Sequence, residues 1–220
     1  MSSVHWDLDS HDGLKYRFHL PAGYDPARVK YPLVISLHGS RERGDDTTSH
    51  LVNGVDELAK WPVIAVAPQC PVGDTFGGSW YGGESATERK VVALARELGT
   101  RRSVDPNRIS LIGYSMGAIG IWDLIERYRG VFAAAVPIAG DLNPESARSL
   151  ADFPIWAFHG ERDKSVRNDS TRRVATMMKQ LGSGKFRYTE FPGVGHDSWQ
   201  PAFSEPELMS WILAQRRVSG

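Results

Sequence analysis

The sequence predicts an α/β fold in which a mostly parallel sheet of eight strands carries helices on both faces. Six strand candidates follow an opening hairpin, and most of them are continuous apolar runs, as expected for strands buried on both faces. Segments with a helical hydrophobic pattern separate these runs, which is the order of strands joined by crossover helices. Because loops at the carboxyl ends of such strands usually carry function, the residues after each run are the first candidates for chemistry.

The opening hairpin is expected from two short alternating segments, residues 4–9 and 15–20, joined by the turn-forming sequence SHDG. The later strands are expected at LVISLHG (33–39), PVIAVAP (62–68), RISLIGY (108–114), FAAAVPIAG (132–140), PIWAFHG (154–160) and FRYTEF (186–191). Helices are expected over residues 50–60, 86–99, 116–127, 170–181 and 205–215. No repeat or long linker divides these elements, so one domain over residues 1–220 is the simplest organisation.

Composition excludes several classes of partner. The 26 Lys and Arg residues balance 26 Asp and Glu residues, so the net charge favours neither nucleic acid nor an anionic membrane. Cys70 is the single cysteine, which excludes an intramolecular disulfide and a cysteine-rich metal site. The first residues lack the apolar core of a signal peptide, and no stretch is long enough to span a membrane, so we expect a cytoplasmic protein. The sequence specifies no oligomeric state.

Ser115 lies in GYSMG, residues 113–117, where a buried strand is expected to run directly into a helix. A serine at such a corner either caps the helix with its hydroxyl or is exposed there as a nucleophile. The spacing matches G-x-S-x-G, in which the glycines let a sharp turn pack strand and helix closely. Because so short a pattern is common, the choice between a cap and a nucleophile depends on partners elsewhere in the chain.

A serine nucleophile needs a base and a carboxylate that orients the base, and both candidates follow Ser115 in the expected chain order. Asp163 lies in WAFHGERDKSV after the seventh strand, and His196 lies in FPGVGHDSW after the eighth. Asp141, after the sixth strand, is a rival for the acid. Asp197 is adjacent to His196 in sequence and therefore badly placed to accept a hydrogen bond from its ring. We expect Ser115, Asp163 and His196 to form a catalytic triad.

Two backbone N–H groups are expected to stabilise the oxyanion that such a triad generates. LHGSRERGDD follows the third strand, and we expect the first donor to be the N–H of Ser40, with that of Arg41 as the alternative. The N–H of Met116, directly after the nucleophile, is the expected second donor. His38 and Gly39 are expected to shape this turn and not to react.

These motifs resemble the α/β-hydrolase superfamily, and more narrowly its compact serine esterases of the dienelactone hydrolase-like, phospholipase/carboxylesterase and polyhydroxybutyrate depolymerase-like groups. The resemblance covers nearly the whole chain. LPAGYDPARVKYPLVISLHG is similar to the family's entry strand and oxyanion turn, RISLIGYSMG to its elbow, HGERDKSV to its acid loop and GVGHDSW to its histidine loop. The resemblance implies hydrolysis of carboxylic esters through an acyl-enzyme, without a metal or an organic cofactor. Dienelactone hydrolases proper have a cysteine at Ser115, and relatives often have a glycine at Arg41.

The length of one loop predicts an open cleft. Many lipases insert a lid near the sixth and seventh strands, but only DLNPESARSLADFP, with room for one short helix, lies between them here. We therefore expect no large lid domain and a preference for short-chain or aromatic, feruloyl-type esters. Trp80 and Trp199 are expected to wall the substrate pocket, since rigid aromatic side chains line small-molecule sites. Arg41, in RERGDD, is close enough to the oxyanion turn to favour an acidic substrate.

The sequence thus predicts a serine carboxylesterase whose partner is a small-molecule ester. A peptidase or amidase of the same fold is the first alternative, because the same triad cleaves amides; the chain has no propeller-like domain that would select peptides. A binding protein that keeps the fold without the chemistry is the second alternative, and an intact triad argues against it.

Overall fold

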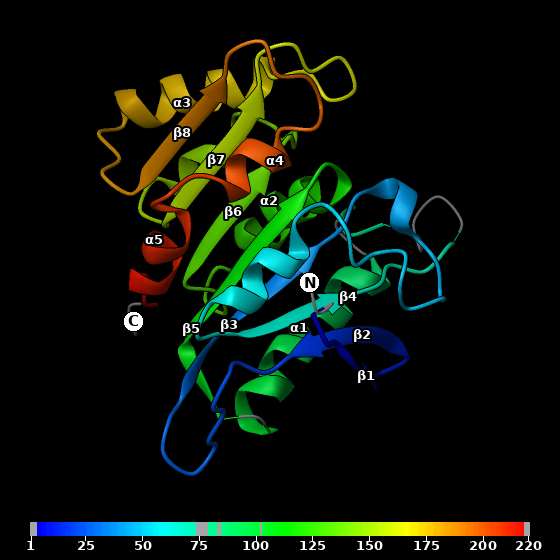
Figure 1. Ribbon diagram of the computed structural model, residues 1–220. Helices are drawn as coiled ribbons and strands as arrows, with labels where there is room; N and C mark the ends of the chain where they lie inside the picture. The colour runs from blue at the N-terminus through cyan, green and yellow to red at the C-terminus, as the bar shows by residue number, and fades with distance from the viewer. Residues whose placement is uncertain (1–3, 74–78, 83–84, 102, 218–220) are drawn as a thin grey trace.

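A computed structural model describes residues 4–73, 79–82, 85–101 and 103–217. Its strands are β1 (Asp7–His11), β2 (Leu14–His19), β3 (Tyr31–Leu37), β4 (Ile64–Pro68), β5 (Val104–Tyr114), β6 (Ala134–Ile138), β7 (Ile155–Gly160) and β8 (Phe186–Phe191). They form one sheet in the order β1-β2-β4-β3-β5-β6-β7-β8 (Figure 1). β2 pairs antiparallel with β1 and β4, and the other pairings are parallel. The predicted mostly parallel, eight-stranded sheet is confirmed.

Helices cover both faces of this sheet. They are α1 (Ala86–Arg101), α2 (Met116–Tyr128), α3 (Asp169–Gln180), α4 (Trp199–Phe203) and α5 (Leu208–Ala214), with the 3-10 turns η1 (Ser40–Glu42), η2 (Val55–Lys60) and η3 (Ser146–Leu150). In Figure 1, α1 and α2 lie behind the sheet, whereas η2, α4 and α5 lie in front of it. This arrangement agrees with the predicted helices on both faces.

The side chains of the central strands divide between two hydrophobic clusters. Leu33 and Ile35 of β3 belong to the cluster that includes residues of α1, α2 and α3, whereas Val34 between them belongs to the cluster of η2 and α5. Successive side chains of a strand point to opposite faces of its sheet, so a strand buried on both faces must be apolar throughout. Burial on both faces of the sheet therefore explains the continuous apolar runs in the sequence.

The opening hairpin turns at Asp12 and Gly13, which have φ angles of 49° and 73°. His11 is paired with Leu14 across the turn. Two central residues with positive φ are typical of the tight turns whose twist matches a hairpin, and glycine and aspartate tolerate this conformation well. The turn therefore sets the register in which β2 delivers Leu14 and Tyr16 to the core.

The expected helix over residues 50–60 is wrong, because the described chain forms only the six-residue turn η2 at its end. Asn53 and Gly54 immediately precede η2 with φ angles of 55° and 84°, which interrupts a right-handed helix. A Cβ atom on Gly54 would lie 2.5 Å from the ring of Phe203. Close packing against α4 thus takes precedence over the local helical pattern.

The expected helix over residues 205–215 is shorter than predicted. α5 begins at Leu208, and the separate helix α4 ends at Phe203. Pro206 lies between the two helices, and proline disfavours a helical conformation of the residue before it. The chain therefore crosses this face of the sheet as two short helices.

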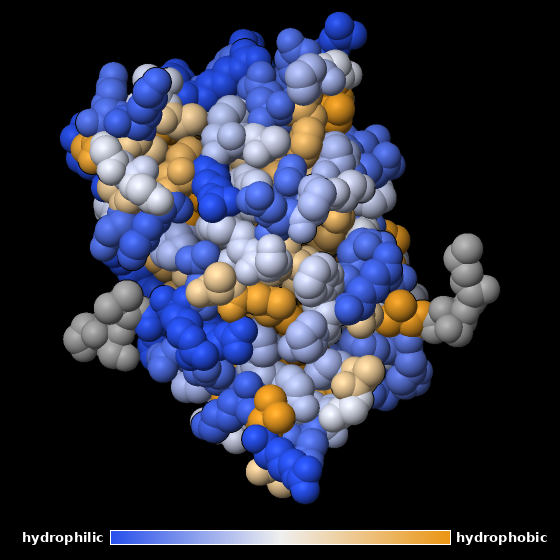
Figure 2. All heavy atoms as spheres, turned by 60° about the vertical axis from the view of Figure 1, so that its left-hand side comes forward, coloured by the Kyte–Doolittle hydropathy of each residue, from blue (hydrophilic) through white to orange (hydrophobic). Residues whose placement is uncertain are grey.

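Hydrophilic residues predominate on the face of the molecule shown in Figure 2, and hydrophobic residues occur there in small separate groups. Scattered apolar residues of this kind are ordinary on protein surfaces. Among the residues that the structure describes, no helix is both long and apolar enough to cross a membrane.

Glu88, in the first turn of α1, is a buried carboxyl group with 1% of its surface exposed. Burial raises its pKa from 4.5 to about 7, and the nearby Asp123 carboxylate acts in the same direction. Arg127, whose Nε lies 3.9 Å from Glu88 Oε1, offsets part of this rise. Because the folded state binds this proton more tightly than the unfolded chain does, the contribution of Glu88 to stability is present below pH 4.5 and is lost as the pH rises through about 7.

Glu88→Gln should remove this pH dependence, since glutamine has the same size and does not titrate. The difference in the free energy of unfolding, variant minus unmodified protein, should therefore be larger at pH 8 than at pH 5, which means that the variant is relatively more stable at pH 8. Urea denaturation at both pH values measures the difference. Glu126→Gln, at an exposed position of α2, is the matched control. A difference between Glu88→Gln and the unmodified protein that is the same at both pH values contradicts the prediction.

Candidate active site

Ser115 lies at the corner between β5 and α2, with backbone angles φ 55° and ψ −118°. A non-glycine residue with positive φ carries backbone strain, which persists only where the surrounding structure enforces it. The corner is tight because α2 approaches β3: a Cβ atom on Gly117 would lie 2.0 Å from the carbonyl oxygen of Leu37. Only glycine fits at that position, so the second glycine of the motif has a steric cause.

His196 lies in the loop between β8 and α4, and its ring lies between Ser115 and Asp163. Nε2 is 3.0 Å from Ser115 Oγ, and Nδ1 is 2.7 Å from Asp163 Oδ2. The histidine loop reaches this position by packing against the end of β7, where a Cβ atom on Gly160 would lie 2.1 Å from the carbonyl oxygen of Gly195. The structure thus brings together all three residues of the predicted triad.

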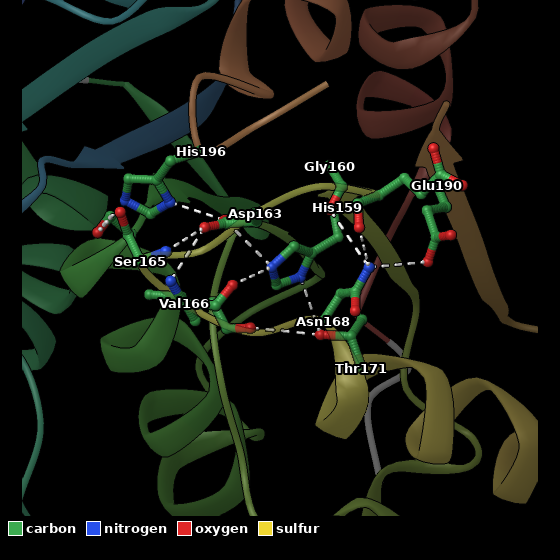
Figure 3. A network of polar contacts seen from close by, with 12 residues as sticks. His159, Gly160, Asp163, Ser165, Val166, Asn168, Thr171, Glu190 and His196 are labelled. Atoms are coloured by element: carbon green, nitrogen blue, oxygen red, sulfur yellow. Dashed lines mark hydrogen bonds and ion pairs between the residues drawn. The ribbon is translucent and has the colours of Figure 1, made fainter. Parts of the chain in front are cut away.

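The Asp163 carboxylate is fully buried and held by its own loop. Its Oδ1 accepts hydrogen bonds from the backbone N–H groups of Ser165 and Val166, at 2.9 and 3.0 Å (Figure 3). An ionised carboxylate can only accept hydrogen bonds, so His196 donates from Nδ1 and keeps the lone pair of Nε2 for the Ser115 hydroxyl. Asp141, the rival acid, is exposed in the loop after β6, and the contact with His196 comes from Asp163.

Tyr114, the second residue of the G-x-S-x-G motif, packs against His196 with the ring centroids 5.0 Å apart. Its hydroxyl lies 3.5 Å from Asp197 Oδ1, and burial raises the pKa of that hydroxyl above its usual value. Tyr114 therefore stays neutral near pH 7, and its ring restricts the orientation of the His196 imidazole. The sequence analysis did not single out Tyr114, although its place beside the serine was an available signal.

His38 shapes the turn after β3, as predicted. Burial lowers the pKa of its ring to about 4, so the ring is neutral near pH 7. Nδ1 lies 2.6 Å from the carbonyl oxygen of Gly39, to which it donates. Nε2 accepts a hydrogen bond from the backbone N–H of Cys70 at 2.8 Å. These two bonds require one proton on the ring and fix the direction of the Gly39 carbonyl.

A cavity of about 550 Å³ opens over Ser115 and His196. Three further residues named from the sequence, Ser40, Arg41 and Met116, line this cavity. Arg41 faces a mixed environment there, since Glu42, Arg43 and Asp197 also contribute to the lining. Tyr81, which the sequence analysis passed over in favour of its neighbour Trp80, is another lining residue.

Trp80 and Trp199 do not wall the cavity, so both expectations are corrected. Trp80 is completely buried; its indole N–H donates to the carbonyl oxygen of His38 at 3.0 Å, and its ring packs edge-on against the His38 ring. Trp199 begins α4 and packs against the hydrophobic cluster on that face of the sheet. Trp80 therefore supports the turn after β3, and the half-buried Trp199 packs against the core.

Cys70 is buried, and burial raises the pKa of its thiol to about 12. A thiol that stays protonated is a poor nucleophile. Within the described part of the chain, no group of three or more His, Cys, Asp or Glu side chains is placed to hold a metal ion.

The strand order, the strained serine corner and the serine–histidine–aspartate contacts together define an α/β-hydrolase. The dienelactone hydrolase family model matches residues 74–207, which is more than half of the chain. The protein belongs to the dienelactone hydrolase family.

Individual relatives agree with this placement. A solved thermostable esterase superimposes with a TM-score of 0.84 and 30% sequence identity over 97% of this chain and 63% of its own. A solved ferulic acid esterase gives a TM-score of 0.71 at 16% identity, over 96% of each chain, and so shares the fold. Poly(3-hydroxyalkanoate) depolymerase C of Paucimonas lemoignei is 28% identical over 56% of this chain. The chain spans only 30% of that depolymerase.

Proposed function

We propose that the protein is a serine carboxylic ester hydrolase that works through an acyl-enzyme. The observation that carries this proposal is the unbroken chain of hydrogen bonds from Ser115 Oγ through His196 to Asp163, which opens into a cavity. A helix cap, the alternative role for Ser115, is disfavoured because its side chain makes no capping bond to α2. Membership of the dienelactone hydrolase family supports the same reaction class.

In the proposed reaction, Ser115 Oγ bonds to the ester carbonyl carbon while His196 Nε2 takes the hydroxyl proton. Collapse of the tetrahedral intermediate breaks the bond to the alcohol oxygen, which receives that proton from His196. Water then repeats the sequence on the acyl-enzyme and releases the acid. Asp163 keeps a proton on Nδ1 throughout and stabilises the imidazolium that forms.

The backbone N–H groups of Ser40 and Met116 are the proposed donors to the oxyanion. Each is the first residue of a helical turn, where backbone N–H groups have no partner inside the helix. The Gly39 carbonyl and the Ser40 N–H belong to one planar trans peptide and point in opposite directions. His38 binds the Gly39 carbonyl from the buried side, which supports a Ser40 N–H that points toward the cavity lined by Ser40.

Short-chain or aromatic, feruloyl-type esters are the proposed substrates. The cavity volume of about 550 Å³ suits a small molecule, and Tyr81 and Tyr114 offer aromatic surfaces within it. Between β6 and β7 the chain forms the short turn η3, which supports the expectation of an open cleft without a large lid.

Initial rates on nitrophenyl esters from acetate to laurate, on methyl ferulate and on a peptide anilide would test the proposed function, with Ser115→Ala as the blank. We expect rates that peak at short or aromatic acyl groups and disappear in the blank. Cleavage of the anilide without cleavage of any ester would indicate a peptidase. No cleavage of any substrate would indicate a binding protein.

A further inference from the structure

His159, at the end of β7, lies on the opposite side of the Asp163 carboxylate from His196 (Figure 3). Both side chains are completely buried, and His159 Nε2 is 3.3 Å from Asp163 Oδ2. The same oxygen receives the hydrogen bond from His196. Two imidazoles therefore meet on one carboxylate oxygen, and the sequence analysis gave a role to only one of them.

The partners of His159 show which ring nitrogen carries a proton. Nε2 faces two groups that only accept, the Val166 carbonyl at 2.9 Å and Asp163 Oδ2, so Nε2 is the donor. Nδ1 is 3.1 Å from the Thr171 hydroxyl. That hydroxyl also lies 3.3 Å from the Gly140 carbonyl, and it can either donate to Nδ1 or accept from it.

With His159 included, both oxygens of the Asp163 carboxylate face polar partners on every side. Oδ1 receives the two backbone N–H groups of Ser165 and Val166, and Oδ2 receives His196 and faces His159. A carboxylate offers about four lone-pair positions. Any rotation about the bond to the carboxyl group would break at least one of these contacts inside the core, where an unsatisfied group is costly.

We propose that His159 is a positioning residue: Nε2 donates to the Val166 carbonyl in the acid loop and lies 3.3 Å from Asp163 Oδ2, and these contacts hold the Asp163 carboxylate in the orientation that His196 requires. This inference rests on the proposed triad function. His159 does not line the cavity itself, and it acts through Asp163 and through Val166, whose carbonyl oxygen accepts from Nε2. Its N–H also withdraws negative charge from the oxygen that binds His196.

Two effects should therefore follow the loss of this donor. A carboxylate that can rotate orients His196 less well, which lowers kcat with little change in KM. Oδ2 also keeps more negative charge and stabilises protonated His196 in the resting enzyme, so the acid limb of the kcat/KM profile should move to higher pH.

Of the titratable groups around the two histidines, one on each side keeps a constant charge during this readout. On the His196 side they are Tyr114 and Asp197, and burial keeps the pKa of Tyr114 above its usual value. On the His159 side is Glu190, whose pKa the bound Arg172 holds below its usual range. Tyr114 and Glu190 thus keep constant charges between pH 5 and 8.

The test compares His159→Gln, His159→Asn and His159→Leu. A glutamine amide can place an N–H near the position of Nε2, whereas the shorter asparagine cannot. We expect kcat on the best nitrophenyl ester to fall about 10- to 100-fold in the Leu and Asn variants, with the acid limb displaced upward. Glutamine should recover most of the rate and a profile close to that of the unmodified enzyme.

Met178→Ala, at a buried position of α3, is the control for destabilisation alone and should leave the pH profile unchanged. Equal kcat values and equal profiles for Gln and Asn would overturn the proposal, even if the Leu variant fails to fold. A loss of stability in His159→Leu without any change in kcat or profile would also overturn it.

Nitrogen-15 NMR of the histidine side chains in Ser115→Ala separates this inference from the proposed reaction, because it needs no turnover. We expect an imidazole with a proton on Nε2, whose signals disappear in His159→Gln. A bare Nε2 would overturn the positioning role. If the unmodified protein hydrolyses no ester while the NMR result holds, the reaction assignment fails and the hydrogen-bond assignment stands.

Discussion

Replacing Ser115 with alanine is expected to lower ester turnover by about 10⁵- to 10⁶-fold. The variant loses the oxygen that bonds to the carbonyl carbon, and His196 then has no hydroxyl from which to accept a proton. The cavity and the proposed backbone donors remain, so a small acceleration over the reaction in water should persist. Steady-state rates on a nitrophenyl ester give the fold-decrease in turnover. They should be measured at enzyme concentrations high enough to detect residual activity.

Ser210→Ala, at an exposed position of α5, is the matched control and should keep the rate of the unmodified protein. Stability should not fall in Ser115→Ala, because alanine retains the Cβ atom and the hydroxyl makes no capping bond to α2. An alanine variant that hydrolyses esters within tenfold of the unmodified rate would exclude Ser115 as the nucleophile.

Asp163→Asn is expected to lower kcat by about 10⁴-fold while the fold is kept. The asparagine oxygen must face the backbone N–H groups of Ser165 and Val166, which bind Oδ1 in the unmodified protein. Its NH₂ group then faces His196 Nδ1. To accept that bond His196 must move its proton to Nε2, where it can no longer take the proton of the Ser115 hydroxyl.

The matched variant is Asp141→Asn, which removes the rival carboxylate from the exposed loop after β6. It should hydrolyse esters at the unmodified rate. Circular dichroism and thermal unfolding would establish that both variants are folded before their kcat values are compared. A reversed result, with Asp141→Asn inactive and Asp163→Asn active, would transfer the role of the acid to Asp141.

Much of the fold was predictable because the central strands are buried on both faces. A strand such as β3, whose side chains enter both hydrophobic clusters, must be apolar along its length, and that requirement is visible in the sequence. The prediction of a helix over residues 50–60 was wrong for a reason that lies in the tertiary structure. Its hydrophobic spacing is helical, but Gly54 packs closely against Phe203 of a distant segment.

The positions of the three residues of the candidate site were also predictable from the sequence. Ser115, Asp163 and His196 each follow a recognisable strand, and parallel strands end at one edge of their sheet. The aromatic side chains were harder to place. Trp80 and Tyr81 are adjacent in the sequence, yet Trp80 packs under His38 and Tyr81 lines the cavity.

The sequence by itself determined the class of fold and the positions of the serine, the aspartate and the histidine after their strands, because strand burial and turn geometry leave a local pattern. Only the tertiary structure decided which neighbouring aromatic ring faces the cavity and that His159 shares an oxygen of Asp163 with His196. The direction of a loop side chain and the partners of a buried carboxylate depend on segments far away in the chain, and no local pattern carries that information.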